Sequence, residues 1–187
     1  CLGVWIEDDK GDQFVVMQKP ELTRMKDSNG DGRGDSFETV CDDYGFHGNY
    51  HEYAHGPVRD KEGNYYFSLN LSHGGSERTS WRAGGPFMGS MGGYRGWACR
   101  VTPKGKFEPF ANGLRSPAGI GVDPEGRIWY AENQGEYVGS SKVVPLEKGK
   151  FYGHLSGLLT LEGKMKPDSA ELKFDKWKDK IRKGAVW

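Results

Sequence analysis

The chain has 187 residues, with 26 basic and 26 acidic side chains, so its formal net charge is zero. This balance gives no indication of a nucleic-acid partner, and no apolar run approaches the roughly 20 residues that a membrane-spanning helix needs. Glycine (29 residues) and aromatic residues (13%) are both abundant, which is typical of short strands joined by tight turns.

The cysteines say little about the compartment. Cys1, Cys41 and Cys99 are widely spread and match no zinc or haem-attachment spacing. Cys99 lies in a strand-like run and is expected to be a small core residue. The chain starts at Cys1 with no signal peptide before it and ends on an apolar run, so we expect it to be a piece of a longer protein.

The first distinctive motif is "DSNGDGRGDSFE", which runs from Asp27 to Glu38. Its acidic and amide residues have the spacing of a calcium-binding loop, and such an oxygen set suits Ca²⁺ better than a transition metal. The flanking segments "LTRM" and "SFETVC" are strand-like, so we expect a loop inserted in a β-hairpin and not an EF-hand. The predicted ligands are Asp27, Asn29, Asp31, the carbonyl of Arg33, and Asp35.

Glu38 stands at the last ligand position of that loop, but it has a counterpart elsewhere. The segments "ACRV" and "KFEPFA" repeat the flanks of the loop, with Arg100 in place of Arg24 and Glu108 in place of Glu38. Only the plain turn "TPKG" joins these two segments. Glu38 is therefore either a ligand or a shared feature of the hairpins.

Three histidines follow the first hairpin, in "HGNYHEYAHGP". His47, His51 and His55 are four residues apart, which would bring them together on a helix. The glycines and the proline of this segment make a helix improbable, so we expect a loop. A zinc cluster and three separate histidines both remain open at this point.

A repeat then becomes visible. "DKEGNYYFSLN" (60–70) and "DPEGRIWYAEN" (123–133) share Asp, Gly, an aromatic run and Asn at an offset of 63 residues, from Asp60 to Asp123. Each predicts a turn followed by a buried strand. The glycine-rich stretch 72–97 interrupts the first of the two units, and we expect an ordered loop there.

These units predict an all-β fold, namely a partial β-propeller with four-stranded antiparallel blades. The expected blades are residues 1–45, which would be the tail of one blade, 46–113 and 114–187. A complete propeller needs four to eight blades. The helix candidate at 169–183 has poorly spaced apolar residues and reads equally well as an irregular connection.

The segment 112–154 contains "RSPAG", "ENQG" and "GKFYGH" in that order. With these motifs the chain resembles the PQQ-dependent soluble glucose and sorbosone dehydrogenases, which are six-bladed β-propellers. The resemblance is closest to propeller modules of large secreted dehydrogenase-like proteins, some of which carry a cytochrome c module. Ser116 and Ala118 stand where this family has Asn and Gln, and Glu136 stands where it has Pro.

The resemblance implies roles for individual residues. It makes His51 the base that takes a proton from the sugar's anomeric hydroxyl, and it makes Arg115 the cation that faces the quinone. Gln134 and Ser116 correspond to cofactor contacts, and the carbonyl of Gly135 corresponds to a calcium ligand beside PQQ. A sugar substrate, a cytochrome c electron acceptor and a periplasmic or extracellular location are implied as well.

Two other functions remain open from the residues alone. The first is a non-catalytic propeller, braced by calcium, that binds glycans or protein partners. The second is a calcium-dependent lactonase-like hydrolase, in which Asn70 and Asn133, expected at the ends of equivalent inner strands, hold a central metal. That reading also needs a central acid, and strand alternation disfavours both Glu132 and Asp60.

Overall fold

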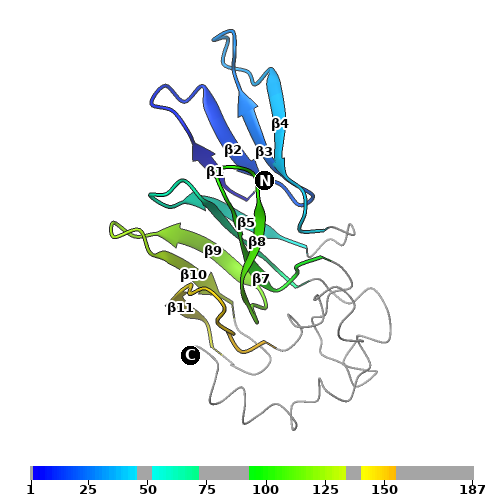
Figure 1. The fold of residues 1–187 in the computed structure, drawn as a ribbon, viewed down its shortest axis with the longest axis vertical. Helices are drawn as coiled ribbons and strands as arrows, with labels where there is room; N and C mark the ends of the chain where they lie inside the picture. Colours follow the sequence, from blue (N-terminus) through cyan, green and yellow to red (C-terminus); the bar gives the residue numbers. More distant parts are fainter. Residues whose placement is uncertain (1, 46–51, 72–92, 134–139, 155–187) are drawn as a thin grey trace.

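The computed structural model describes residues 2–45, 52–71, 93–133 and 140–154. These residues form three antiparallel sheets, with sequence neighbours paired throughout (Figure 1). The first sheet contains β1 (Val4–Ile6), β2 (Gln13–Met17), β3 (Leu22–Lys26) and β4 (Ser36–Cys41). The second contains β5 (Ala54–Arg59), β6 (Tyr65–Leu69), β7 (Trp97–Val101) and β8 (Phe107–Asn112). The third contains β9 (Pro117–Val122), β10 (Ile128–Glu132) and β11 (Lys142–Pro145).

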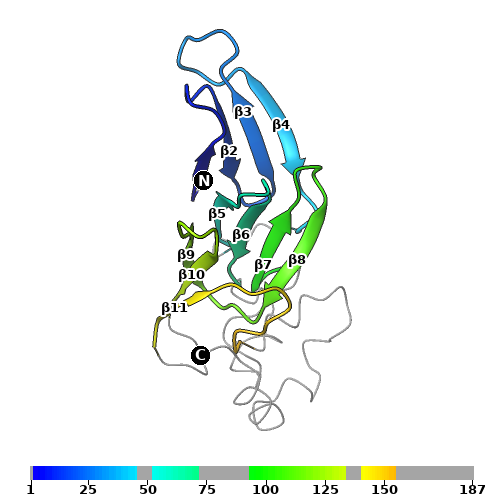
Figure 2. The same ribbon diagram turned by 60° about the vertical axis from the view of Figure 1, so that its left-hand side comes forward.

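The three sheets are successive blades of a partial β-propeller, as predicted. They follow one another along the long axis of the molecule (Figures 1 and 2). The first strands of the blades, β1, β5 and β9, are the inner strands, since β5 packs against both β1 and β9. No helix occurs among the described residues, and the all-β class is confirmed.

The inner strands approach one another most closely at Gly56 in β5. Its φ is +119°, and an added Cβ would lie 3.2 Å from Ile120 Cγ2 of β9. On the other side, a Cβ on Gly3 would lie 2.1 Å from the Gly56 carbonyl oxygen. Only glycine fits where three blades meet with so little space.

The turn repeat is confirmed in its hydrogen bonds. Asp60 Oδ1 accepts from the amide of Asn64 and Asp123 Oδ1 accepts from the amide of Arg127, each at 2.8 Å. The other carboxylate oxygen accepts from an aromatic side chain of the next strand, Tyr66 or Trp129. The first sheet has a third copy, in which Asp8 Oδ1 accepts from the amide of Asp12 at 3.0 Å.

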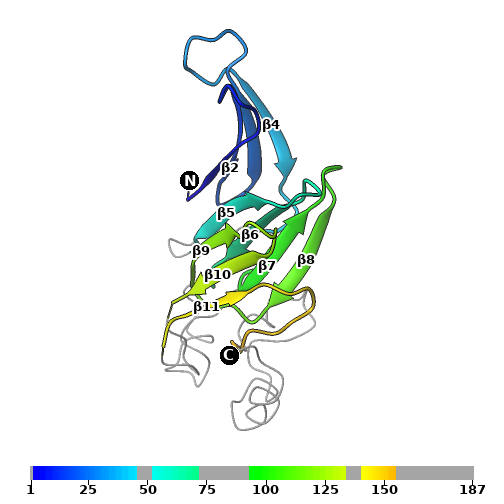
Figure 3. The same cartoon turned by 90° about the vertical axis from the view of Figure 1, so that its left-hand side faces the viewer.

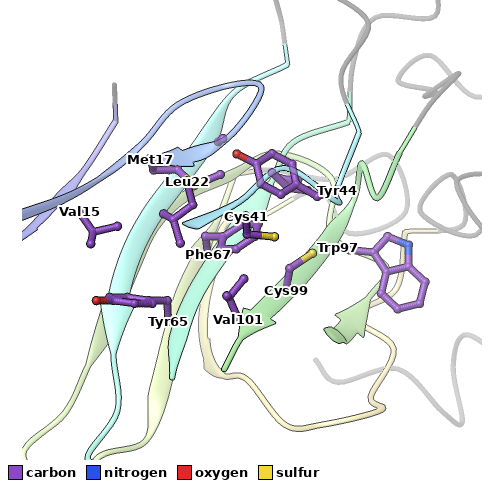
Figure 4. Close-up of a cluster of buried hydrophobic side chains, with 12 residues drawn as sticks. Val15, Met17, Leu22, Cys41, Tyr44, Tyr65, Phe67, Trp97, Cys99 and Val101 are labelled. Carbon is purple, nitrogen blue, oxygen red and sulfur yellow. The ribbon is translucent and has the colours of Figure 1, made fainter. Parts of the chain in front are cut away.

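The core lies between the sheets. One cluster of buried side chains joins the first two blades, including Leu22 and Tyr44 from the first and Phe67 and Cys99 from the second (Figure 4). The rings of Tyr44 and Phe67 are 4.9 Å apart, centroid to centroid. A second cluster joins the second and third blades. Cys99 is fully buried, which confirms that it is a core residue.

The two hairpins are equivalent, as the sequence predicted. Arg24 is paired with Glu38 across β3 and β4, and Arg100 is paired with Glu108 across β7 and β8. Arg24 Nη1 lies 2.8 Å from Glu38 Oε2. Arg24 also binds Glu7 of the first blade at 2.6 Å, and Glu7 accepts from the Tyr65 hydroxyl of the second blade. This network ties the two blades together.

The structure differs from the predicted layout at three points. Residues 1–45 were expected to be only the tail of a blade, but they contain a complete four-stranded sheet. His55 was expected in a loop, but it lies in β5, where the pairing with β6 shifts register between His55 and Val58. Asn70 and Asn133 follow β6 and β10, which are second strands of their blades and not inner ones. The candidate helix 169–183 lies outside the described residues.

The strand directions give the blades two distinct ends (Figure 3). We call one the hairpin end, because it carries the turns 8–12, 27–35, 60–64, 102–106 and 123–127. We call the other the linker end, because it carries the segments that lead into β5 and β9. At the linker end, the Arg95 guanidinium donates to the carbonyls of Lys19, Gly45 and Tyr53. The Asn70 side chain donates to the Ser116 hydroxyl at the same end.

Candidate functional site

Arg115 and Ser116 precede the inner strand β9 at the linker end, and hydrogen bonds from other segments fix their backbone. The Glu132 carboxylate accepts from the Arg115 amide at 2.9 Å and from the Ser116 amide at 2.7 Å. The Leu71 amide donates to the Arg115 carbonyl at 2.8 Å, and the Asn133 amide donates to the Ser116 carbonyl at 3.2 Å. All four backbone polar groups of the dipeptide are therefore bonded.

The side chains around this dipeptide add a further polar contact. Asn70 Nδ2 donates to Ser116 Oγ at 3.1 Å, and Asn70 is buried while Asn133 is exposed. The two asparagines therefore do not present their carboxamides in the same way, although they end equivalent strands. The lactonase reading had assigned the two asparagines the same environment.

Glu132 itself is buried, with 6% of its surface exposed. Burial raises the pKa of its carboxyl above the ordinary value, although the two backbone donors act in the opposite direction. Its two oxygens are engaged by Arg115 and Ser116, and Asp60 lies at the hairpin end. Asp60 is therefore remote from the two asparagines, and Glu132 is already bonded to two backbone amides.

The motif "GKFYGH" forms backbone hydrogen bonds with the segment that comes just before the dipeptide. The Tyr152 amide donates to the Asn112 carbonyl at 2.8 Å, and the His154 amide donates to the Gly113 carbonyl at 2.9 Å. Gly113 has φ +78°, and an added Cβ would lie 2.5 Å from Phe151 Cδ2. The motif "GKFYGH" thus bonds to residues 112–113, just before the dipeptide, while Glu132 of "ENQG" binds the dipeptide itself.

A buried ion pair braces the segment that leads into β5. Arg95 Nε lies 3.6 Å from Glu52 Oε1, and both side chains have 0% exposure. The Arg95 guanidinium also donates to the carbonyls of Tyr53, Gly45 and Lys19 at 3.2–3.4 Å. Burial lowers the pKa of Arg95, while Glu52 opposes this effect. Glu52 directly follows His51 in the sequence.

The predicted site residues are described to different extents. His51, Gln134 and Gly135, together with His47, lie outside the described residues. Arg115 and Ser116 are brought together with Glu132 and Asn70, two residues to which the sequence assigned no such contact. His55 is half-buried in β5, and burial lowers the pKa of its imidazole.

The calcium-type loop lies at the hairpin end, away from Arg115. Asp27 accepts from the amides of Gly30 and Gly32, each at 2.7 Å, and these donors help lower the pKa of Asp27. Asn29 and Asp31 each accept from the amide two residues on, and Asp35 accepts from Ser28. Glu38 points to Arg24 across the hairpin and stands apart from these acceptors.

These contacts fold the loop, and its oxygen donors are those that Ca²⁺ prefers. Among the residues that the structure describes, however, no three acidic, His or Cys side chains converge as a metal-binding group. A calcium site here would also need the side-chain carbonyl oxygen of Asn29 and the backbone carbonyl oxygen of Arg33 as ligands.

Comparisons with known proteins bear on the fold. No protein-family model matches the sequence, and no curated protein sequence does. Among solved structures, the PQQ-bound form of an aldose sugar dehydrogenase from Streptomyces coelicolor aligns over 90% of this chain and 50% of its own, with TM-score 0.53 and 17% identity. The holo form of the pyranose dehydrogenase PQQ domain from Coprinopsis cinerea aligns over 98% and 52%, with TM-score 0.55 and 14% identity.

A third match is the calcium structure of a Trichoderma reesei protein of Carbohydrate-Active Enzymes Family AA12. It aligns over 81% of this chain and 42% of its own, with TM-score 0.55 and 13% identity. The chain thus has the β-propeller fold that sugar dehydrogenases have, and it spans about half the length of these structures. The fold implied by the sequence resemblance is confirmed. In the described residues, no helix is long and apolar enough to cross a membrane.

Proposed function

We propose that this chain is part of a PQQ-dependent sugar dehydrogenase that oxidises an aldose or sorbosone. One observation carries the proposal: Arg115 stands on a fully bonded backbone at the linker end, beside the strand end that leads into Gln134 and Gly135. A guanidinium carried on a backbone fixed in this way suits a cofactor that bears carboxylates and gains negative charge when reduced.

When bound, PQQ supplies the two-electron acceptor for the anomeric C–H of the sugar. Arg115 is assigned the task of holding the negative charge of the cofactor, and Gln134 and Gly135 are assigned contacts to it and to its calcium. His51 is assigned as the base for the anomeric hydroxyl, because a neutral imidazole near pH 7 accepts a proton readily. Ser116 is assigned a cofactor contact through its hydroxyl, whose oxygen accepts from Asn70 while its amide donates to Glu132.

The test is aldose-dependent dye reduction by the full-length protein that contains this chain, after PQQ and Ca²⁺ are added. Replacing His51 by Ala is expected to lower turnover about 100-fold or more, because a general base is removed. Replacing Arg115 by Ala is expected to weaken PQQ binding and to lower turnover. The matched control is Arg127→Ala, which removes an exposed arginine at the hairpin end and is expected to retain turnover.

Absence of turnover in the wild-type protein would overturn the dehydrogenase proposal. Turnover that persists unchanged in both site variants would overturn the assignment of His51 and Arg115.

We also propose that the loop 27–35 binds Ca²⁺ and stiffens the β3–β4 hairpin. At a free Ca²⁺ concentration about 100 times the Kd, the free energy of unfolding should rise by about 2.7 kcal/mol. Thermal melting with and without Ca²⁺ measures this, and the increase should vanish in Asp27→Ala. Asp9→Ala, an exposed aspartate in another turn, should keep it. A calcium response that survives in Asp27→Ala would place the ion elsewhere.

We further propose a periplasmic or extracellular location, with a cytochrome c as the electron acceptor, as the sequence resemblance implies. The same assay tests this partner if the dye is replaced by oxidised cytochrome c and its reduction is followed. Failure of cytochrome c to replace the dye would argue against that partner alone.

A further inference from the structure

The buried Glu132 carboxylate has no part in the oxidation chemistry, yet it is the side chain that holds the Arg115 backbone. Each of its oxygens accepts one amide, at 2.9 Å from Arg115 and at 2.7 Å from Ser116. Two parallel bonds from one carboxylate fix both the position and the orientation of the dipeptide. The remaining backbone groups of the dipeptide bind the ends of β6 and β10.

The equivalent positions in the other blades show that the fold does not need an acid there. The offset of the repeat aligns Glu132 with Leu69 in the second blade, and the turn at Asp8 aligns Met17 in the first. Both of these side chains are apolar and fully buried. A carboxylate is costly to bury, so an acid at a position that packs well with Leu or Met indicates a task other than packing.

The contact between the second-strand acid and the linker dipeptide is also specific to the third blade. The second blade has the same backbone hydrogen bond between the end of its second strand and its linker. The Asn70 amide donates to the Tyr53 carbonyl at 2.9 Å, just as the Asn133 amide donates to the Ser116 carbonyl at 3.2 Å. In the second blade, however, Glu52 occupies the position of Arg115. Among the residues that the structure describes, an acid on the second strand meets a linker that carries a cation in the third blade alone.

We propose that Glu132 is a positioning residue, which fixes the backbone of Arg115 and Ser116 so that the Arg115 guanidinium meets an anionic, carboxylate-bearing ligand at the linker end. The identity of that ligand as PQQ rests on the proposed function. Glu132 acts through Arg115 and is not assigned contact with the sugar or the cofactor.

The test uses the full-length protein that contains this chain, and two variants of it. Glu132→Gln keeps the shape but can accept only one of the two amides, and Glu132→Leu installs the side chain that the second blade has. Hydrogen–deuterium exchange resolved to single residues should become about 10-fold faster or more at Arg115 or Ser116 in Glu132→Gln. The Kd for PQQ, measured by titration calorimetry, should rise about 100-fold, because small displacements of a binding group have effects of this size.

The melting temperature of Glu132→Gln should stay within a few degrees of the wild type, which separates positioning from a general loss of structure. Glu125→Gln removes an exposed carboxylate of the same blade and should change neither exchange nor Kd. Unchanged exchange in Glu132→Gln overturns the inference, and faster exchange with an unchanged Kd overturns the link to the ligand.

A wild-type protein that binds no PQQ overturns the proposed function and, with it, the ligand part of the inference. The exchange measurement still decides by itself whether Glu132 fixes the dipeptide, so the two failures are distinguishable.

Discussion

Replacing Arg95 by Met is expected to destabilise the protein by about 3–5 kcal/mol, because the buried Glu52 carboxylate then loses its ion-pair partner Arg95. Both side chains are fully buried, and Arg95 also donates to three carbonyls from separate segments. For a chain of this size, such a loss corresponds to a fall in Tm of roughly 10 °C. Thermal and urea unfolding of the purified protein measure it.

A double-mutant cycle tests the physical cause. Glu52→Gln combined with Arg95→Met should recover part of the loss, because a neutral amide then replaces the buried carboxylate that lost Arg95. Arg127→Met is the control, since Arg127 is 62% exposed in its ion pair with Asp123 and exposed pairs contribute about 0–1 kcal/mol. Additive effects of the two single variants would show that the pair is not coupled.

The second large effect is expected from Phe67→Ala in the core between the first two blades. Phe67 is fully buried in β6 and packs against Tyr44 of the first blade (Figure 4). Truncation should reduce the free energy of unfolding by about 3–5 kcal/mol, because it removes apolar contacts and leaves a cavity between the blades.

Phe37→Ala provides the matched comparison. Phe37 lies on the outer strand β4 and is 64% exposed, so its truncation should change stability by about 0.5 kcal/mol or less. Equal effects of the two truncations in the same urea titrations would contradict the assignment of this cluster as the core.

The fold could be predicted because its signals are local. The Asp-x-x-Gly turns with an aromatic strand after them predicted the repeat, and the Arg–Glu pairs predicted the hairpins. The third turn, at Asp8, was missed because Gln13, Phe14 and Val15 take the place of its aromatic run. The same backbone contacts can form there with a much weaker sequence pattern.

The polar contacts at the linker end could not be predicted in the same way. Whether Glu132 is buried depends on the amides of Arg115 and Ser116, which come from another segment. Strand alternation shows which side a residue faces, but it does not show what meets it there. Arg95 gave no signal either, because a single arginine in a glycine-rich segment is usually exposed.

Some features of the calcium-type loop could be predicted from its motif, and others could not. The hairpin that carries it was predicted from the second hairpin, and so was the alternative that Glu38 is a shared feature of the two hairpins; the pairing of Glu38 with Arg24 is shown by the structure. The location of the loop at the end opposite Arg115 follows from strand directions. A calcium ion bound there would stabilise the hairpin without touching a ligand at the linker end.

The bonds around Arg115 and Ser116 also have a mechanical consequence. The dipeptide is attached at once to the end of β6 in the second blade and to the end of β10 in the third. Any change in the angle between these two blades must therefore displace Arg115. Substitutions of Gly56, which is remote in sequence from both Arg115 and Glu132 but contacts Ile120 of the third blade, are therefore expected to change the affinity for the ligand.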